Sequence, residues 1–444
     1  MKITQFFESD YNDYAIYDSY RSIGNYVDGM KPSARKSIHT VKERNIRKPF
    51  KVAQLVSQIA ADTQYIHGEQ SLNGVVVGLA TDYAGGNNIN LLLPEGSFGN
   101  RTIQQASASR YIFTCKADAF DMVLNPSDDN NLIKQVFENE EIEPKYFVPI
   151  LPMLLVNGNE GIGNGFAQKI LSRNPKEIIK QLYNNLAGKK VTYNTLIPYF
   201  KGFNGKVVWD NELKNWKIYG SFIKTGQTTI IVKEVPVGYD LEKWKEILDK
   251  LEDNKVIQSY NDKSEDNKFE TEIKVTREFL NQDDEKIFEK LKLIRRVSEN
   301  FTCIDEDNKI REFNSIDEIF EAYISIRLNY YDKRKQYLID KLEKELNFLS
   351  NRAKFIYYVI KGEISINNRS KNDIETQCSN KKLDKIDDKY DYLLNMNLWS
   401  LTKEKLSELK LKLDEKNKEL KDVVETTIND MWIKDLKELE RILK

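Results

Sequence analysis

Two leucine-rich segments near the end of the chain, separated by a polar insert, limit what this sequence can fold into. Apolar residues recur at spacings of three and four over 338–360 and again over 406–443, which is the period of one helix face. The insert at about 362–400 is rich in Asn, Lys and Asp and can reverse the chain. We therefore expect a long intramolecular antiparallel coiled coil over 321–444 with a small helical cap at 362–400. The alternative is two ordinary helices of one domain.

The preceding residues change pattern twice, as expected for a chain of 444 residues, which is longer than one typical domain. After an N-terminal arm at 1–30, residues 31–150 combine short helices at 53–61 and 71–82 with Gly/Asn turns around the apolar strand INLLLP. This pattern suits a winged-helix arrangement.

Residues 151–320 read mainly as strands. The segments KVVWD, WKIYGSFIK, TTIIVKEVPV and FETEIKV alternate apolar and polar residues, and one amphipathic helix, LEKWKEILDKLEDN, interrupts them. The expected fold class is therefore α+β and multidomain, with a β-rich domain between the winged-helix region and the coiled coil.

Composition excludes several classes of protein. Because 68 Lys and Arg oppose 69 Asp and Glu, the net charge of −1 rules out a uniformly basic nucleic-acid coat. Three separated cysteines and two histidines do not assemble a convincing zinc site. The start lacks an apolar signal region and no run is long enough to span a bilayer, so we expect a soluble protein of the reducing cytoplasm without a membrane partner.

One segment is strongly basic in this otherwise neutral chain. Residues 31–51 hold eight basic residues and one acid, Glu43; the cations include Lys31, Lys42 and Arg44. Clustered Lys and Arg gain affinity for duplex DNA by releasing counterions from its phosphates. We expect DNA to bind here; the alternative is a solvated helix face, which would normally interleave both signs of charge.

Six motifs follow one another in the order of a known family. They are RSIGNYVDGMKPSARK, YIHGEQSLNGVVVGLA, NNINLLLPEGSFGNRTIQQASASRYIF, LLVNGNEGIGNGFA, EVPVGYD and YDYLLNMNLWSLTKEKL. Together they resemble the breakage-reunion region of type IIA DNA topoisomerases, and the closest resemblance is to the medium subunit of T-even-type bacteriophage enzymes. The resemblance implies a winged-helix DNA-gate domain, a β-rich tower and a coiled coil whose cap is a dimerising exit gate. A phage origin would place the chain in the host cytoplasm.

The resemblance also implies the chemistry. Family members cut both DNA strands with one tyrosine per protomer, each forming a phosphotyrosyl ester with a 5′ end, and the matching residue is Tyr111 in SASRY. A phenol with a pKa of about 10 needs cationic neighbours or a base to react at neutral pH. Arg110 matches the arginine that contacts the scissile phosphate.

Further residues match the family's basic positions. His67 and Arg35 are expected to stabilise charge on the pentavalent phosphorus, with help from Arg21 and Lys36. A hydrogen-bonded structural role is the alternative for His67. Ile162 in GNEGIGNG matches the family's intercalating isoleucine, an apolar wedge that kinks the duplex.

Two family modules have no counterpart in these motifs. No Walker-type or Gly-rich ATP lid is found. The acidic run Asp305, Glu306 and Asp307 reads as a hairpin turn, so no metal site is expected on this chain. The resemblance therefore implies partner subunits that carry ATP and hold Mg²⁺ at the cleavage site, around a homodimer of this chain. Without a gyrase-type wrapping domain, we expect relaxation and decatenation rather than negative supercoiling.

Two other functions remain open on the sequence. The chain could bend and bridge DNA without cutting it, as a winged-helix protein with a coiled-coil arm. It could also be a purely structural coiled-coil tether, in which case the basic segment would not affect DNA binding.

Overall fold

The computed structural model describes residues 3–443 and divides them into two compact units. The first ends at Arg327 and is rejoined by the chain from Ile433 onward; the second is Leu328–Trp432. This division is coarser than the domains expected from sequence patterns, whose boundaries near residues 30, 150 and 320 stay predictions. Strand pairing and side-chain contacts tie the first three predicted regions together.

The helices predicted at 53–61 and 71–82 are confirmed and lie beside a third. They are α3 (Pro32–Glu43), α4 (Val52–Asp62) and α5 (Glu69–Ala80). Pro32 occupies the first turn of α3, where its missing N–H leaves no hydrogen bond unmade. A small antiparallel sheet of order β1-β3-β2 borders these helices, formed by β1 (Phe50–Lys51), β2 (Leu92–Glu95) and β3 (Phe113–Lys116). Helices with strands at their edge are present, and the assignment of a winged helix stays a prediction.

A second sheet brings distant segments together in the order β16-β15-β7-β6. Its strands are β6 (Asn159–Ile162), β7 (Ala167–Ile170), β15 (Asn300–Ile304) and β16 (Ile310–Glu312). Strands β6 and β7 form a hairpin with Ile162 opposite Ala167. The turn between β15 and β16 contains Asp305, Glu306 and Asp307, which confirms the predicted hairpin there.

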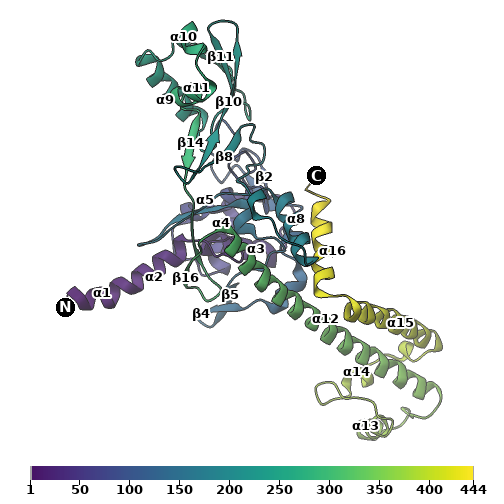
Figure 1. The fold of residues 1–444 in the computed structure, drawn as a ribbon. Helices are drawn as coiled ribbons and strands as arrows, with labels where there is room; N and C mark the ends of the chain where they lie inside the picture. Colours follow the sequence, from purple (N-terminus) through teal and green to yellow (C-terminus); the bar gives the residue numbers. More distant parts are fainter. Residues whose placement is uncertain (1–2, 444) are drawn as a thin grey trace. The chain divides into compact units, whose positions relative to one another are not determined.

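The β-rich region has two antiparallel sheets, visible with their helices in the upper part of Figure 1. The orders are β10-β11-β13-β12 and β14-β9-β8. Trp244 is fully buried in the core of the first sheet, where its indole N–H donates to Thr271 Oγ1 at 3.0 Å. The elements are β8 (Lys206–Asp210), β9 (Asn215–Tyr219), β10 (Ser221–Thr225), β11 (Thr229–Glu234), α9 (Leu241–Asp253), β12 (Ser259–Asp262), β13 (Thr271–Lys274), α10 (Arg277–Leu280), α11 (Asp284–Lys290) and β14 (Ile294–Val297).

The remaining elements of the first unit are mainly short. The N-terminal arm consists of α1 (Ile3–Glu8) and α2 (Asp10–Ser22). The others are α6 (Phe120–Val123), η1 (Pro126–Asn131), β4 (Lys134–Phe137), β5 (Glu140–Pro144), α7 (Met153–Asn157), α8 (Pro175–Leu186) and η2 (Tyr193–Thr195).

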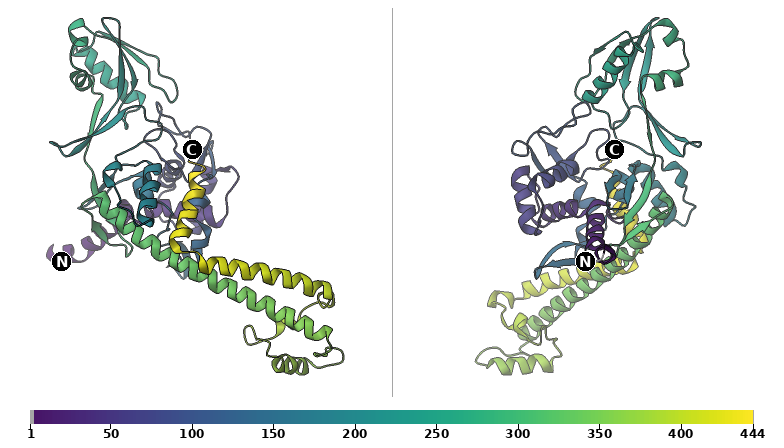
Figure 2. Two further views of the ribbon diagram at one scale, coloured as in Figure 1. Left: turned by 45° about the vertical axis from the view of Figure 1, so that its right-hand side comes forward. Right: turned by 90° about the vertical axis from the view of Figure 1, so that its left-hand side faces the viewer.

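The second unit contains the predicted antiparallel helix pair. Helix α12 (Ile316–Ile360) runs into this unit and lies along α15 (Lys403–Glu425), as both views of Figure 2 show. Lys335 Nζ donates to the Val424 carbonyl at 2.8 Å, and Lys416 pairs with Glu345 at 3.0 Å. Lys335 precedes Glu345 in α12, whereas their partners follow the reverse order, with Val424 after Lys416 in α15. The two helices are therefore antiparallel, as predicted.

The insert forms a small helical cap with its own apolar cluster, which includes Phe355, Cys378 and Tyr390. Its elements are α13 (Lys371–Asn380), α14 (Asp391–Leu394) and η3 (Leu398–Ser400).

The end of the chain differs from the prediction. Helix α16 (Ile428–Glu440) continues beyond the helix pair, and its buried Leu436 and Leu439 belong to the first unit. The leucine spacing there marks an ordinary amphipathic helix. No helix within residues 3–443 combines the length and the apolar character needed to cross a membrane.

Candidate functional site

Tyr111 lies in a turn immediately before β3, and its side chain is 66% exposed. The turn is closed by a hydrogen bond from Tyr111 N to the Ala108 carbonyl at 2.8 Å. Two further bonds tie it to the start of α4, from Ala53 N to the Ser109 carbonyl and from Val52 N to the Ile112 carbonyl. The backbone is held firmly while the phenol projects into solvent, so Tyr111 is not a packing residue of the strand.

The loop EGSFG passes close beneath this turn. Gly96 has φ of +97°, a conformation that favours glycine. A Cβ added there would lie 3.3 Å from Ile112 Cγ2 and 3.7 Å from the Tyr111 carbonyl oxygen. Glycine therefore lets the loop approach the backbone of the tyrosine turn.

Arg110 is exposed beside Tyr111. Its guanidinium carbon lies 4.9 Å from the centre of the Tyr111 ring. This geometry is a cation–π contact, and the arginine charge persists at any physiological pH. A phosphate approaching the phenol would therefore meet a permanent cation with planar hydrogen-bond donors.

His67 lies in a separate pocket of about 600 Å³. Its Nε2 is 2.9 Å from Tyr17 Oη, and the ring of Tyr65 meets it edge-on. Burial lowers the pKa of His67, and the charges of Arg21 and Lys36 lower it further, which favours a neutral imidazole near pH 7. The pocket is also lined by the predicted DNA-binding residues Arg21, Lys31, Lys36 and Ile162.

Arg35 does not face this pocket. It is 1% exposed, and its guanidinium makes two hydrogen bonds to the Asp28 carboxylate, at 2.8 and 3.2 Å, and one to the Met30 carbonyl. Asp28 also accepts from Phe147 N at 3.1 Å. The expected contact of Arg35 with a phosphate is not supported by this placement, because the charge is already neutralised and sealed from solvent.

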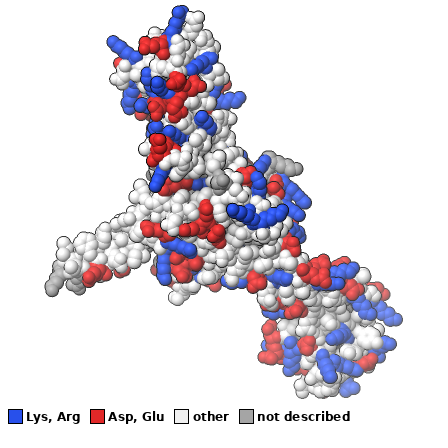
Figure 3. Space-filling model, viewed as in Figure 1, with Lys and Arg blue, Asp and Glu red and all other residues white. Residues whose placement is uncertain are grey.

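The basic segment 31–51 is largely neutralised by acids from elsewhere. Five of its cations form ion pairs: Arg35–Asp28, Lys36–Glu143, Lys42–Asp129, Arg44–Asp62 and Arg47–Asp121. Lys31 donates to the Glu160 carbonyl at 2.8 Å. Figure 3 shows Lys and Arg interspersed with Asp and Glu over most of the face in view. The sequence did not predict these ion pairs, because most of the acids lie far from the basic segment along the chain and only the fold brings them close.

Ile162 stands at the end of β6, and 80% of its side chain is exposed. Large exposed aliphatic side chains at a hairpin tip contribute nothing to a core. Gly161 before it permits a close approach, since an added Cβ would collide with the Ser22 carbonyl. The backbone of the hairpin therefore packs tightly against Ser22, while the apolar side chain of Ile162 stays exposed.

The predicted site residues thus fall into two groups. Tyr111 and Arg110 form the first, and the pocket around His67 forms the second, and among the described contacts none joins them. A site that used both would need a substrate or a second copy of the chain to bridge them.

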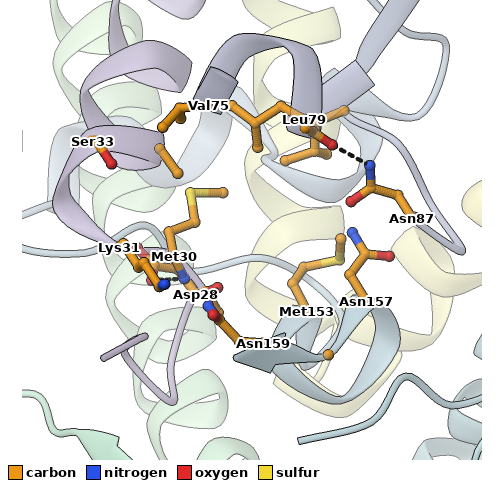
Figure 4. A pocket seen from close by; sticks show the side chains of 15 residues that line it. Asp28, Met30, Lys31, Ser33, Val75, Leu79, Asn87, Met153, Asn157 and Asn159 are labelled. Atoms are coloured by element: carbon orange, nitrogen blue, oxygen red, sulfur yellow. Dashed lines mark hydrogen bonds between the residues drawn. The ribbon is translucent and has the colours of Figure 1, made fainter. Parts of the chain in front are cut away.

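A smaller cavity of about 250 Å³ lies nearby (Figure 4). Met30, Val75, Leu79 and Met153 form an apolar wall, and Asn87 Nδ2 donates to the Gly78 carbonyl at 2.7 Å. Its lining offers no converging cations, so it is not the candidate site.

The described residues hold no cluster of three His, Cys, Asp or Glu side chains that could bind a metal ion. In the acidic hairpin, Glu306 accepts from Tyr26 Oη at 2.8 Å, and the Asp305 carbonyl accepts from Asn25. The Glu306 carboxylate and the Asp305 carbonyl thus hold this hairpin to the segment around Tyr26.

Comparison with known proteins identifies the family. The family model of the DNA gyrase/topoisomerase IV A-subunit matches residues 21–437. The chain belongs to this family. The match covers most of both units of the fold, including the tyrosine turn, His67 and the helix pair.

The chain is also similar to eukaryotic enzymes. It is 33% identical to DNA topoisomerase 2 of Plasmodium falciparum over 97% of this chain and 34% of that protein. It is 31% identical to the mitochondrial DNA topoisomerase 2 of Dictyostelium discoideum over the same shares. The chain therefore spans about a third of the length of these relatives.

The fold matches a solved structure over almost its whole length. The crystal structure of the DNA-binding, cleavage and re-ligation domain of Plasmodium falciparum topoisomerase II superposes with a TM-score of 0.89 at 33% identity. The match covers 98% of this chain and 64% of that one. The architecture described above is thus that of a topoisomerase II cleavage and re-ligation domain.

Proposed function

We propose that this chain is the DNA-cleaving and religating subunit of an ATP-dependent type II DNA topoisomerase. The observation that carries the proposal is Tyr111, an exposed phenol on a rigid turn beneath the Arg110 guanidinium, in a fold of this family. A nucleophile needs access to its substrate, and a cation beside it can bind the phosphate that it attacks; Tyr111 is exposed and Arg110 lies next to it.

The proposed reaction is an ester exchange. Tyr111 Oη attacks a backbone phosphorus, a P–O bond forms to the tyrosine, and the bond to the 3′ oxygen breaks. The phenolic proton passes to solvent or a base, and the departing 3′ oxygen acquires one. Because one phosphodiester replaces another, the energy of the broken bond is kept and the step reverses without hydrolysis.

The chain's other groups have separate roles in this proposal. Arg110 stabilises the charge that develops on the phosphate oxygens. Arg21 and His67 hold the duplex backbone at the pocket, and Ile162 enters between base pairs. Lys36 lines the same pocket but is paired with Glu143, so it would reach a phosphate only by giving up that pair. Arg35 acts indirectly, because its pair with Asp28 joins α3 to the loop before it.

Metal and ATP are assigned to partner subunits. When bound at the cleavage site, Mg²⁺ would supply positive charge at the leaving oxygen, but the described side chains of this chain do not form a set that fits it. The finer assignment, a medium subunit of the T-even bacteriophage type acting in the host cytoplasm, is part of the proposal. Co-purification from the native source with mass spectrometry of the partners tests it.

A homodimer follows from the need for two tyrosines. We place its contact in the cap at 362–400, which has its own apolar cluster and would act as the exit gate. Sedimentation of the purified chain measures the dimer directly; a chain that stays monomeric at all concentrations contradicts this placement.

Covalent trapping tests the central claim. The reconstituted enzyme is denatured with detergent during reaction with DNA, and labelled DNA joined to this chain is measured. Tyr111→Phe should abolish the adduct and leave DNA affinity nearly intact, because only the hydroxyl is lost. Tyr14→Phe is the matched control, since Tyr14 is similarly exposed and has no role in the proposed chemistry.

Each outcome discriminates between functions. An adduct that persists in Tyr111→Phe would place the nucleophile elsewhere. Duplex bending without any adduct, in wild type and variant alike, would favour the non-cleaving DNA-bridging protein.

A further inference from the structure

Helix α2 of the N-terminal arm packs against the hairpin that carries Ile162. Tyr11 Oη donates to Asn164 Oδ1 at 3.0 Å. A Cβ added to Gly163 would lie 2.9 Å from Ser19 Cα, so the hairpin backbone approaches the helix closely. The position of α2 is therefore linked to that of the Ile162 tip.

The same helix reaches His67. Tyr17 Oη lies 2.9 Å from His67 Nε2, and the two rings are 6.3 Å apart between centres. Arg21, one turn further along α2, places its guanidinium carbon 5.5 Å from the centre of the Tyr17 ring. Tyr17 is thus held by its own helix while its hydroxyl meets the histidine.

The direction of this hydrogen bond follows from acidity. A phenol is a stronger acid than a neutral imidazole N–H, so Tyr17 O–H donates and Nε2 accepts. The proton of the neutral ring then resides on Nδ1, because the partner of one ring nitrogen determines the state of the other. No hydrogen bond of the described chain engages Nδ1 of His67, which leaves Nδ1–H as a donor for an acceptor such as a phosphate oxygen.

We propose that Tyr17 is a positioning residue that fixes the ring and the tautomer of His67 so that Nδ1–H is presented to a DNA phosphate. The proposal rests on the proposed DNA-cleaving function. Since α2 contacts both the Ile162 hairpin and His67, the arm would align the apolar wedge and the phosphate donor through one rigid element.

Histidine NMR tests the proposal without relying on activity. The chain has two histidines, His39 and His67, so ¹⁵N-histidine labelling of the full chain yields two ring systems. At neutral pH, His67 should show a protonated Nδ1 and an unprotonated Nε2. Tyr17→Phe should shift both nitrogens toward the mixture of tautomers found in water, and His39 should not change.

A second variant separates the hydroxyl from the aromatic ring. Tyr65 contacts the edge of the His67 ring at 5.5 Å between centres, without a hydrogen bond to it. Tyr65→Phe should therefore leave the tautomer of His67 unchanged. An unchanged His67 spectrum in Tyr17→Phe, or an equal shift in Tyr65→Phe, would overturn the proposal.

Cleavage by the assembled enzyme gives the functional readout. Tyr17→Phe should slow adduct formation at saturating DNA by about threefold to tenfold, the change expected for one hydrogen bond of ordinary net strength. Faster cleavage would mean that Tyr17 blocks His67 instead of positioning it. If Tyr111→Phe still forms the adduct, the proposed function fails, whereas the tautomer result for His67 stands or falls separately.

Discussion

The basic segment 31–51 and the turn that carries Tyr111 (residues 107–111) differ in how far their charged groups are exposed and neutralised. The segment has eight cations, but five form ion pairs and Arg35 is sealed from solvent. The turn has a single arginine, and it is exposed beside an exposed phenol. Charge density along a sequence therefore does not measure the charge that a ligand meets, because acids distant in sequence can neutralise it.

The energetic consequences also differ. Removing one partner of a buried ion pair leaves an uncompensated buried charge, which is strongly destabilising. Removing an exposed group has little effect on stability and can act only on what binds there. Substitutions in the two regions should thus change different measured quantities.

Arg35→Ala should have the largest effect on folding. It leaves Asp28 buried and unpaired, so the free energy of unfolding should fall by about 3–5 kcal/mol. Urea denaturation of the purified chain measures this change. Normal stability with lost cleavage would show that Arg35 acts on the phosphate. The buried arginine of the basic segment and the exposed arginine of the tyrosine turn would then have the same kind of role.

Arg110→Ala should show the reverse pattern. Adduct formation should fall roughly 10²–10³-fold, the usual effect of removing a group that stabilises transition-state charge, while stability changes by less than about 0.5 kcal/mol. Quench-flow trapping in the assembled enzyme measures the rate, and urea denaturation is the control. A large loss of stability would mean that Arg110 is a structural residue.

Ile162→Ala tests an exposed group that carries no charge, and it should change DNA bending rather than stability. DNA bending should be largely lost, whereas affinity should change by less than about tenfold, because phosphate contacts dominate affinity. Fluorescence energy transfer across a labelled duplex measures the bend. Ile133→Ala is a control at another exposed isoleucine; unchanged bending by Ile162→Ala would remove the wedge assignment.

Asp121→Asn tests an exposed pair of the basic segment and should have the smallest effect. Burial raises the pKa of Asp121, but bonds to Lys116 and Arg47 outweigh it and leave the pKa below its usual value. The contribution to stability is therefore present above the unfolded pKa of about 3.9 and is lost as pH falls through the lower folded value.

The variant should be less stable at pH 7 by no more than about 1 kcal/mol. This difference should vanish at a pH below the folded pKa of Asp121. Urea midpoints at both pH values measure it, and an equal difference at the two would contradict the ion-pair origin.

Local patterns predicted most elements of the fold. The strand KVVWD is β8, and LEKWKEILDKLEDN contains α9, because alternation and helical spacing express contacts made within a few residues. Leu436 and Leu439 have the same spacing as the helix pair, yet they are buried in the first unit. Spacing reports that a face is apolar and does not report which surface covers it.

The candidate site was only partly predictable. Composition could not select Tyr111 among 23 tyrosines, and the resemblance of SASRY to family motifs was needed. Neither approach found Tyr17, since its partner His67 lies 50 positions away and a tyrosine on an exposed helix face is ordinary.

By itself, the sequence determined the order of helices and strands, the apolar faces and the family motifs, all of which depend on neighbouring residues. Tertiary structure decided which charges are accessible: it buried Arg35 on Asp28, exposed Arg110 beside Tyr111 and brought Tyr17 to His67. The physical reason is that desolvation and ion pairing depend on distance in space, which a one-dimensional pattern does not contain.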